Sequence, residues 1–265
     1  MDLFKAYEIP QSKTGRLQLG PLNLWITNLE DEWKLSWLYS MDPIDSSLSE
    51  LKIENELPTI IGGIERRFGF KEKSNIIYLT PQLSDRSMVV RPDTPLLIPA
   101  QEKVGFHLST SLWVNISDGG REKYLTELPA FRPSDTWFGE STSDGELCYV
   151  TKTAARLRVE QLPARKHRAI TSINIHNLGI EPLLVDRIKV PMKNLSLYRN
   201  EAGFYHTESL DYEWNGNESM IKMVFKGKPH FLNMNLTLVS EPRIKLPGNL
   251  VVRTFRSLFN SSKEE

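Results

Sequence analysis

The sequence has one cysteine, no long apolar run and no excess of either charge. Cys148 has no second cysteine to pair with, and a chain of 265 residues buries enough surface to fold without a disulfide. Charged residues interrupt every apolar stretch before the roughly 20 residues that a membrane-spanning helix needs. The amino terminus also lacks the basic stretch and apolar run of a secretory signal. These absences predict a reduced, cytoplasmic protein without a transmembrane segment.

Motifs for nucleic acids, metals and cofactors are missing as well. The 33 basic and 33 acidic residues give a net charge of +0, which removes a global attraction for nucleic acid. Five histidines are scattered singly, without a His-X-His pair or a His-Glu-X-X-His motif, so we expect no zinc site. Gly62-Gly63 lacks the spacing of a phosphate-binding loop. No cofactor, metal or nucleic-acid partner is therefore predicted.

What the sequence does contain is a period of two in its apolar residues, which is typical of half-buried strands. Gly20-Pro21 and Asn215-Gly216 interrupt this pattern at expected hairpin turns. The segments that alternate most clearly are 16–19, 22–27, 33–39, 104–108, 112–116, 155–160, 171–175 and 232–238. This pattern predicts an all-β protein of two antiparallel β-sandwich-like domains, with one extended pair of sheets as the alternative.

The composition changes once, between residues 131 and 145, where Ser, Thr, Gly, Asp and Pro accumulate. Such a stretch is typical of a loop between domains. We therefore expect an N-terminal β domain over 1–130, a crossing loop over 131–145, a C-terminal β-sandwich over 146–240 and a tail over 241–265. The polar stretch 42–56 fits either a loop or a short helix.

The tail changes its apolar period from two to that of a helix. Five basic residues and no acidic one lie between Arg243 and Lys263. This predicts a short C-terminal amphipathic helix, which we expect to pack on its own domain. The alternative is that it docks on a partner or an anionic membrane surface. Its contact residues would then be Arg253, Phe255, Arg256 and Phe259.

Two further segments are candidates for ligand binding. One is the basic cluster Arg156, Arg158 and 165–168, since arginine suits phosphate or carboxylate. The other is the loop 135–146, which carries acidic and aromatic side chains suited to acid–base work or sugar stacking. Both segments also have a simpler, structural interpretation. The basic cluster would be a face of the protein exposed to water, and the loop 135–146 would be a crossing between domains that its aromatic side chains anchor. The candidate ligand-binding residues are Arg132, Trp137, Glu140, Arg165, His167 and Arg168.

Several short sequence motifs form a recognisable series along the chain. They are DRSMVVRP at 85–92, PLLIP at 95–99, SLWV at 111–114, FRPSDTWFG at 131–139, GELCY at 145–149, LSLY at 195–198 and VVRTF at 251–255. The series resembles an uncharacterised family of archaeal and bacterial proteins catalogued as a domain of unknown function. The resemblance implies no catalytic residue, and it implies a link of some members to small-conductance mechanosensitive channels.

Two functions follow as expectations. The first is a non-enzymatic protein that works by binding, as an accessory or regulatory partner on the cytoplasmic side of a membrane channel, or as a homo-oligomer. The second is a hydrolase or carbohydrate-binding enzyme that uses the loop 135–146, with Glu140, Asp144 or Glu146 beside Trp137 and His167. Cys148, in a short apolar strand, is expected to be packed and inert.

Overall fold

The computed structural model describes residues 3–42, 45–55, 59–120, 123–139, 145–153, 156–163, 165–216, 221–229 and 235–245. Two compact units are present. The first unit comprises Met1–Gln82 and Ser111–Arg132, and the second comprises Leu83–Thr110 and Pro133–Glu265. Apart from two 3₁₀ turns, Val159–Gln161 and Met192–Asn194, the regular structure of the described residues is strand. The all-β prediction is therefore confirmed.

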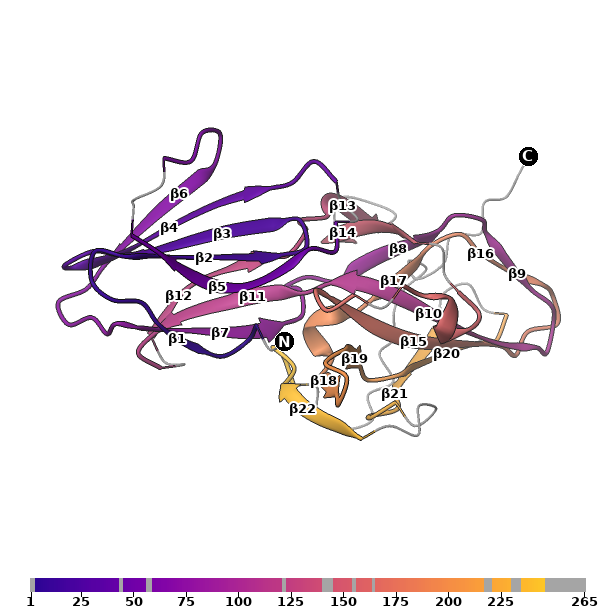
Figure 1. The fold of residues 1–265 in the computed structure, drawn as a ribbon. Coiled ribbons are helices and arrows are strands. Elements are labelled where there is room, and N and C mark those ends of the chain that lie inside the picture. The colour runs from indigo at the N-terminus through magenta and orange to yellow at the C-terminus, as the bar shows by residue number, and fades with distance from the viewer. Residues whose placement is uncertain are drawn as a thin grey trace. The chain divides into compact units, whose positions relative to one another are not determined.

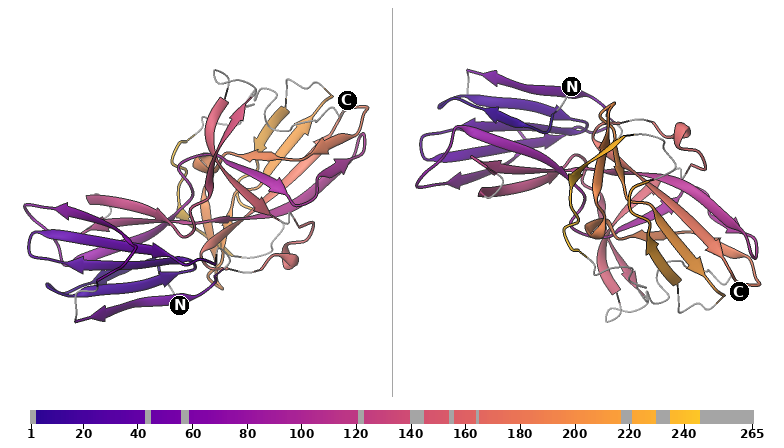
Figure 2. Two further views of the ribbon diagram at one scale, coloured as in Figure 1. Left: turned by 90° about the horizontal axis from the view of Figure 1, so that it is seen from above. Right: turned by 90° about the horizontal axis from the view of Figure 1, so that it is seen from below.

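The first unit is a sandwich of two antiparallel sheets, which Figures 1 and 2 show as stacked layers. Its four-stranded sheet has the order β1-β7-β11-β12 and its five-stranded sheet the order β5-β2-β3-β4-β6. The strands of the four-stranded sheet are β1 (Ala6–Glu8), β7 (Ile76–Gln82), β11 (Trp113–Asp118) and β12 (Lys123–Pro129). Those of the five-stranded sheet are β2 (Thr14–Leu19), β3 (Leu22–Asn28), β4 (Glu32–Tyr39), β5 (Leu48–Glu54) and β6 (Ile64–Gly69).

The hairpin expected around Gly20-Pro21 joins β2 to β3. Gly20 has a φ of 58°, a left-handed conformation that glycine adopts without a steric cost. Leu17 lies opposite Leu24 in the register, so their side chains share one face of the sheet. The polar stretch 42–56, which fitted a loop or a helix, contributes strand β5 instead.

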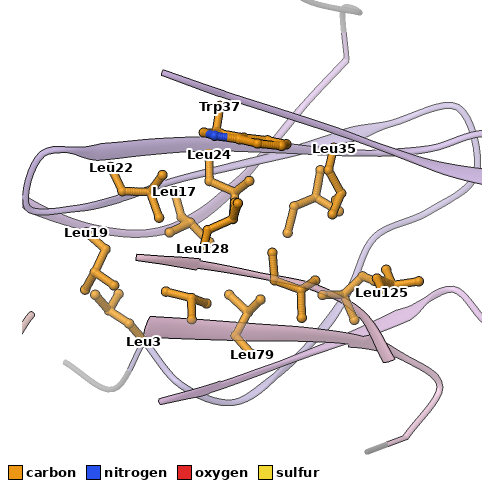
Figure 3. Packing of buried hydrophobic residues seen from close by; sticks show 14 of the residues in the cluster. Leu3, Leu17, Leu19, Leu22, Leu24, Leu35, Trp37, Leu79, Leu125 and Leu128 are labelled. Atoms are coloured by element: carbon orange, nitrogen blue, oxygen red, sulfur yellow. The ribbon is translucent and has the colours of Figure 1, made fainter. Parts of the chain in front are cut away.

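The core of the first unit fills the space between its two sheets. Figure 3 shows leucines of β2, β3 and β4 pointing toward leucines of β7 and β12. Each fully buried aliphatic side chain stabilises the fold by about 1.5–3 kcal/mol relative to an exposed one. The residues of this core that are fully buried, at 0 % exposure, are Ile9, Leu22, Leu24, Ile26, Trp33, Leu35, Ile77, Ile116 and Ala130.

The second unit contains three sheets. A seven-stranded sheet has the order β21-β20-β15-β19-β18-β22, and β10 also pairs with β15. Its strands are β10 (Lys103–Ser111), β15 (Arg168–Asn177), β18 (Leu197–Asn200), β19 (Tyr205–Thr207), β20 (Leu210–Trp214), β21 (Ile221–Phe225) and β22 (Leu236–Ser240). A four-stranded sheet, β13-β14-β8-β17, comprises β8 (Met88–Pro92), β13 (Ser134–Gly139), β14 (Gly145–Thr153) and β17 (Ile188–Val190). Strands β9 (Leu96–Ile98) and β16 (Leu183–Val185) form the two-stranded sheet.

Parallel pairs in the second unit depart from the purely antiparallel expectation. β14 runs parallel to β8, and β15 runs parallel to both β19 and β20. Ala169 lies opposite Tyr205 whereas Ile173 lies opposite Leu210, so the register along β15 shifts by one residue. The chain between β19 and β20 accommodates that extra residue, as in a bulge.

Other details also differ from the sequence interpretation. Segment 155–160 was expected to be a strand, but its described part makes one bridge, between Arg156 and His107, and a 3₁₀ turn. Leu157 is 61 % exposed, because a segment paired through a single bridge does not form a strand that can bury its alternate residues. Residues 134–139, inside the expected crossing loop, form β13, and residues 83–110 belong to the second unit. The expected C-terminal helix lies outside the described residues.

Candidate functional site

A turn of basic residues leads into β15 of the second unit. It contains Arg165, Lys166, His167 and Arg168. His167 is fully buried, whereas the residues on either side are partly exposed. The structure therefore separates the predicted ligand residues of this turn into an internal histidine and cationic side chains that reach the surface.

Arg168 is held in a fixed orientation. Its Nε donates to Ser109 Oγ at 2.8 Å, and a terminal guanidinium nitrogen donates to the Ser109 carbonyl oxygen. Burial and the nearby charge of Arg165 lower the pKa of Arg168 to about 10. The guanidinium is still protonated at neutral pH, within a positively charged surrounding.

A second strand brings another cation to the same turn. A Cβ atom built at Gly203 would lie 3.4 Å from Arg199 Nη2 and 3.6 Å from Lys166 Nζ. Arg199 is on β18, and Gly203 is in the left-handed turn between β18 and β19, with a φ of 84°. Lys166 Nζ also lies 6.0 Å from the centre of the Phe204 ring.

Histidines from two strands lie near each other in the seven-stranded sheet. His107 Nδ1 is 2.7 Å from Ser172 Oγ, and His206 lies opposite Ile170 and Tyr198 in the register. Burial, together with the nearby His107, lowers the pKa of His206 to about 4. Burial also lowers the pKa of His107, and the charge of Glu160 partly offsets this. Both imidazoles are consequently neutral at pH 7.

The hairpin of β13 and β14 presents two apolar side chains at its surface. Trp137 is 45 % exposed and Leu147 is 48 % exposed, and they lie opposite each other in the register. A Cβ atom at Gly145 would overlap Trp137 Nε1, so glycine at this position lets the indole lie flat on the strand. We call Trp137 and Leu147 the apolar pair. Arg86 Nη1 lies 3.1 Å from Asp135 Oδ1, on the strand that carries Trp137.

The opposite face of this hairpin is packed. Phe138 and Cys148 are buried there against Val89. Lys189 Nζ lies 3.2 Å from Glu146 Oε1, and Cys148 Sγ lies 3.4 Å from the same oxygen. Burial alone would raise the pKa of Glu146. Hydrogen bonds with Ser87 and Lys189, together with the lysine charge, lower it below its usual value. Glu146 is therefore an ionised member of a structural ion pair.

Cys148 is expected to resist thiol reagents in the native protein. Burial, followed by the charge of Glu146, raises the pKa of its thiol to about 12, so only about one molecule in 10⁴ carries the thiolate at pH 8. Ellman's reagent at pH 8 should label almost no thiol within an hour, and one thiol per chain in 6 M guanidinium chloride. Stoichiometric labelling of the native protein within minutes would contradict this assignment.

A cavity of about 570 Å³ lies in the first unit, beyond the end of β11. Three of its charged groups, Lys73, Lys123 and Asp118, have hydrogen-bond partners. Lys73 Nζ donates to Asn28 Oδ1, and Lys123 Nζ donates to the Glu72 carbonyl oxygen at 3.1 Å. Asp118 accepts hydrogen bonds from the Trp33 indole at 2.9 Å and from the Ser74 amide. We interpret this polar network as structural.

The remaining predicted residues are not part of one site. Arg132 is exposed and belongs to the first unit, where its charge acts on Tyr39. Trp137 is on the four-stranded sheet and Arg168 on the seven-stranded sheet of the second unit. Glu140, Arg253, Phe255, Arg256 and Phe259 lie outside the described residues. Within the described ranges, no group of three His, Cys, Asp or Glu side chains is arranged to hold a metal ion.

A family model described as "Protein of unknown function (DUF432)" matches residues 3–260. The chain belongs to this family. The match extends over both units, so both belong to the DUF432 architecture. No curated protein and no solved structure matches the chain. No helix among the described residues of this DUF432 member is long and apolar enough to cross a membrane.

Two residues of the candidate surfaces escaped the sequence interpretation. Arg199 and His206 are single polar residues in short strands, and nothing in their local sequence separates them from ordinary strand residues. The alternation in LSLYRN does place Tyr198 and Arg199 on opposite faces. The neighbours of these residues come from β15 and the basic turn, which lie about 30 residues earlier in the chain.

Proposed function

We propose that this DUF432 protein is a non-enzymatic binding module, and that its partner is the cytoplasmic side of a small-conductance mechanosensitive channel. The observation that carries the binding role is the apolar pair. The resemblance of the sequence to channel-linked members supports the choice of partner. A cytoplasmic location follows from the same proposal.

The apolar pair has the character of a protein–protein contact. Tryptophan is among the residues that contribute most to such interfaces, particularly at their centre. Trp137 and Leu147 present adjoining apolar surface, and the Arg86–Asp135 ion pair supplies polar groups on the same hairpin. An apolar centre with a polar rim is the usual composition of an interface between proteins.

The same hairpin offers less support to the rival function, a hydrolase or sugar-binding enzyme. Trp137 and Glu146 point to opposite faces, since Glu146 lies opposite Phe138 in the register. The Glu146 carboxylate is paired with Lys189, and His167 is fully buried. In such an enzyme, the indole that stacks on the substrate and the carboxylate that acts as acid or base must contact the same substrate. Side chains that point to opposite faces of the hairpin do not favour this.

The contact is tested with the purified channel of the same organism in detergent. We expect the channel to bind the full-length protein, and Trp137→Ala/Leu147→Ser to weaken this at least about tenfold, as for the loss of a central interface residue. Ile180→Ser is the matched control, because Ile180 is 90 % exposed in another turn of the second unit and should change affinity less than about twofold. Absence of wild-type binding, or equal binding of the double variant, would refute the proposal.

The C-terminal tail is a separate part of the same proposal. Deleting residues 249–265 removes the predicted contacts Arg253, Phe255, Arg256 and Phe259. If the tail docks on the channel or its membrane, the deletion should reduce both capture by the channel and flotation with anionic liposomes. Identical behaviour of the two proteins would assign the tail no role in binding and leave the apolar pair as the proposed contact.

A further inference from the structure

We propose that Lys73 and Asn28 of the first unit become joined by an intramolecular isopeptide bond, which forms between Lys73 Nζ and Asn28 Cγ with release of ammonia. The bond adds a covalent link to the polar network beside the cavity of this unit. Both residues lie in the first unit, whereas the apolar pair lies in the second. The inference is therefore independent of the proposed channel partner.

The two reacting groups come from the two sheets of the first unit. Asn28 is the last residue of β3 in the five-stranded sheet, and Lys73 shortly precedes β7 in the four-stranded sheet. Lys73 Nζ donates a hydrogen bond to Asn28 Oδ1. A nitrogen in that position lies about 3–4 Å from the carbonyl carbon, and nucleophiles attack from about 3–3.5 Å. The nucleophile and the amide carbon are thus already in contact.

The Asn28 amide is held in one orientation. Asn28 is fully buried, and its Nδ2 donates to the Ile9 carbonyl oxygen at 2.6 Å and to Asn75 Oδ1 at 2.9 Å. Two acceptors on the nitrogen keep the amide oxygen turned toward Lys73. A reaction between groups held in this way is much faster than the same reaction between free molecules, because the entropy of bringing them together has already been lost on folding.

The surroundings of Lys73 favour its neutral, nucleophilic form. Lys73 Nζ lies 4.8 Å from the centre of the buried Trp33 ring. The next residue, Ser74, donates its backbone amide to the buried Asp118 carboxylate at 3.1 Å, which fixes the chain beside the lysine. Burial lowers the pKa of Lys73, and the charges of Asp118 and Asp31 offset this only in part. A lysine with a lowered pKa is more often neutral at pH 7 and is a better nucleophile.

The atoms and electrons of the reaction balance without an added reactant. The Lys73 ammonium loses a proton, and its nitrogen lone pair forms the new bond to Asn28 Cγ. The bond between Cγ and Nδ2 then breaks. Two of the three ammonium protons leave with Nδ2, so the released group is an ammonium ion. Nothing is oxidised or reduced, and a neutral amide replaces a charged group in a partly buried site.

The bond has a structural consequence for the first unit. The segment between Asn28 and Lys73 contains β4, β5 and β6. A link between its ends closes these strands into a covalent loop, which restricts the unfolded chain in the way a disulfide does. This chain cannot use a disulfide for that purpose, because it has one cysteine.

Mass spectrometry of the denatured full-length protein measures the bond directly. We expect a mass about 17 Da, one ammonia, below the mass of the sequence. After digestion with trypsin, a branched peptide should join residues 17–34 to residues 72–86. The second of these peptides contains Lys73 uncleaved, because trypsin does not cut after a lysine whose side-chain nitrogen is in an amide.

The test variant is Lys73→Arg, and the matched control is Lys123→Arg. Arginine keeps the positive charge, but its guanidinium stays protonated and does not attack an amide. Lys123 lines the same cavity and donates to the Glu72 carbonyl oxygen, away from Asn28. We expect the test variant to have the full mass of its sequence and the control to keep the loss of ammonia. Circular dichroism checks that both variants fold.

The results separate this bond from other losses of ammonia. A deficit that persists in Lys73→Arg, as a succinimide at Asn215-Gly216 would produce, overturns the proposal. A folded wild-type protein with the full mass of its sequence also overturns it. The branched peptide from the wild type, together with a deficit that only Lys73→Arg lacks, supports it. If Lys73→Arg does not fold, the presence or absence of the branched peptide in the wild type decides.

Discussion

Trp33→Ala is expected to reduce the free energy of unfolding of the first unit by about 4 kcal/mol. Trp33 is fully buried in the core between the two sheets, so its removal leaves a large cavity. Its indole N–H also donates to the buried Asp118 carboxylate at 2.9 Å, and the substitution removes that partner. Urea unfolding, followed by hydrogen exchange of peptides from each unit, measures the loss and locates it.

Trp25→Ala is the matched control for this prediction. Trp25 is on the neighbouring strand β3 but only half-buried, with the Arg16 guanidinium 5.3 Å from its ring centre. An exposed cation–π contact contributes about 0.5–1 kcal/mol, so we expect a much smaller loss of stability. If the two alanine variants lost equal stability, the assignment of Trp33 to the core and of Trp25 to the outer face would be wrong.

Asn177→Ala is expected to destabilise the second unit by about 3 kcal/mol or more. Asn177 ends β15 and is fully buried, and its side-chain amide donates to the carbonyl oxygens of Ile98, Pro99 and Glu181 at 2.8–3.0 Å. Its side-chain oxygen accepts from the Gly179 amide at 2.9 Å. Alanine would leave these buried groups without partners, and an unsatisfied buried polar group costs about 1–3 kcal/mol. Thermal unfolding by calorimetry provides the measurement.

Gln101→Ala controls for the loss of an amide at the same turn. Gln101 Nε2 donates to the carbonyl oxygens of Leu178 and Gly179, but this side chain is exposed, so water replaces it. The expected loss is at most about 1 kcal/mol. A larger effect of Gln101→Ala than of Asn177→Ala would show that the turn is not organised around the buried asparagine.

The apolar pair and the basic turn also differ in how much of each could be predicted from the sequence. Trp137 was predicted as a ligand-binding residue because an aromatic stood in a polar loop. The structure makes its segment a strand, with Leu147 beside it. The basic turn was visible as four consecutive basic or titratable residues, but its completion by Arg199 was not. Pairing between segments about 30 residues apart is set by tertiary structure, and no local pattern records it.

The alternation of apolar residues predicted burial correctly for strands with partners on both sides, and wrongly for a segment paired through a single bridge. Leu17, Leu24 and Leu35 alternate with polar residues and are buried, because each lies in a sheet that packs on a second sheet. Leu157 alternates equally well and is exposed, because its segment makes one bridge and then turns. A period of two reports which residues share a face, and burial requires a second layer to cover that face.

The sequence by itself determined the strand content, the turn at Gly20-Pro21, the antiparallel pairing of the strands on either side of Asn215-Gly216 and the packed position of the lone cysteine. All of these depend on neighbours within a few residues, or on composition. Tertiary structure alone decided the parallel pairing of β15, the assignment of residues 83–110 to the second unit and the meeting of Lys166 with Arg199. The reason is that strand order and register are chosen by the free energy of the whole packed sheet, in which many locally equivalent pairings compete.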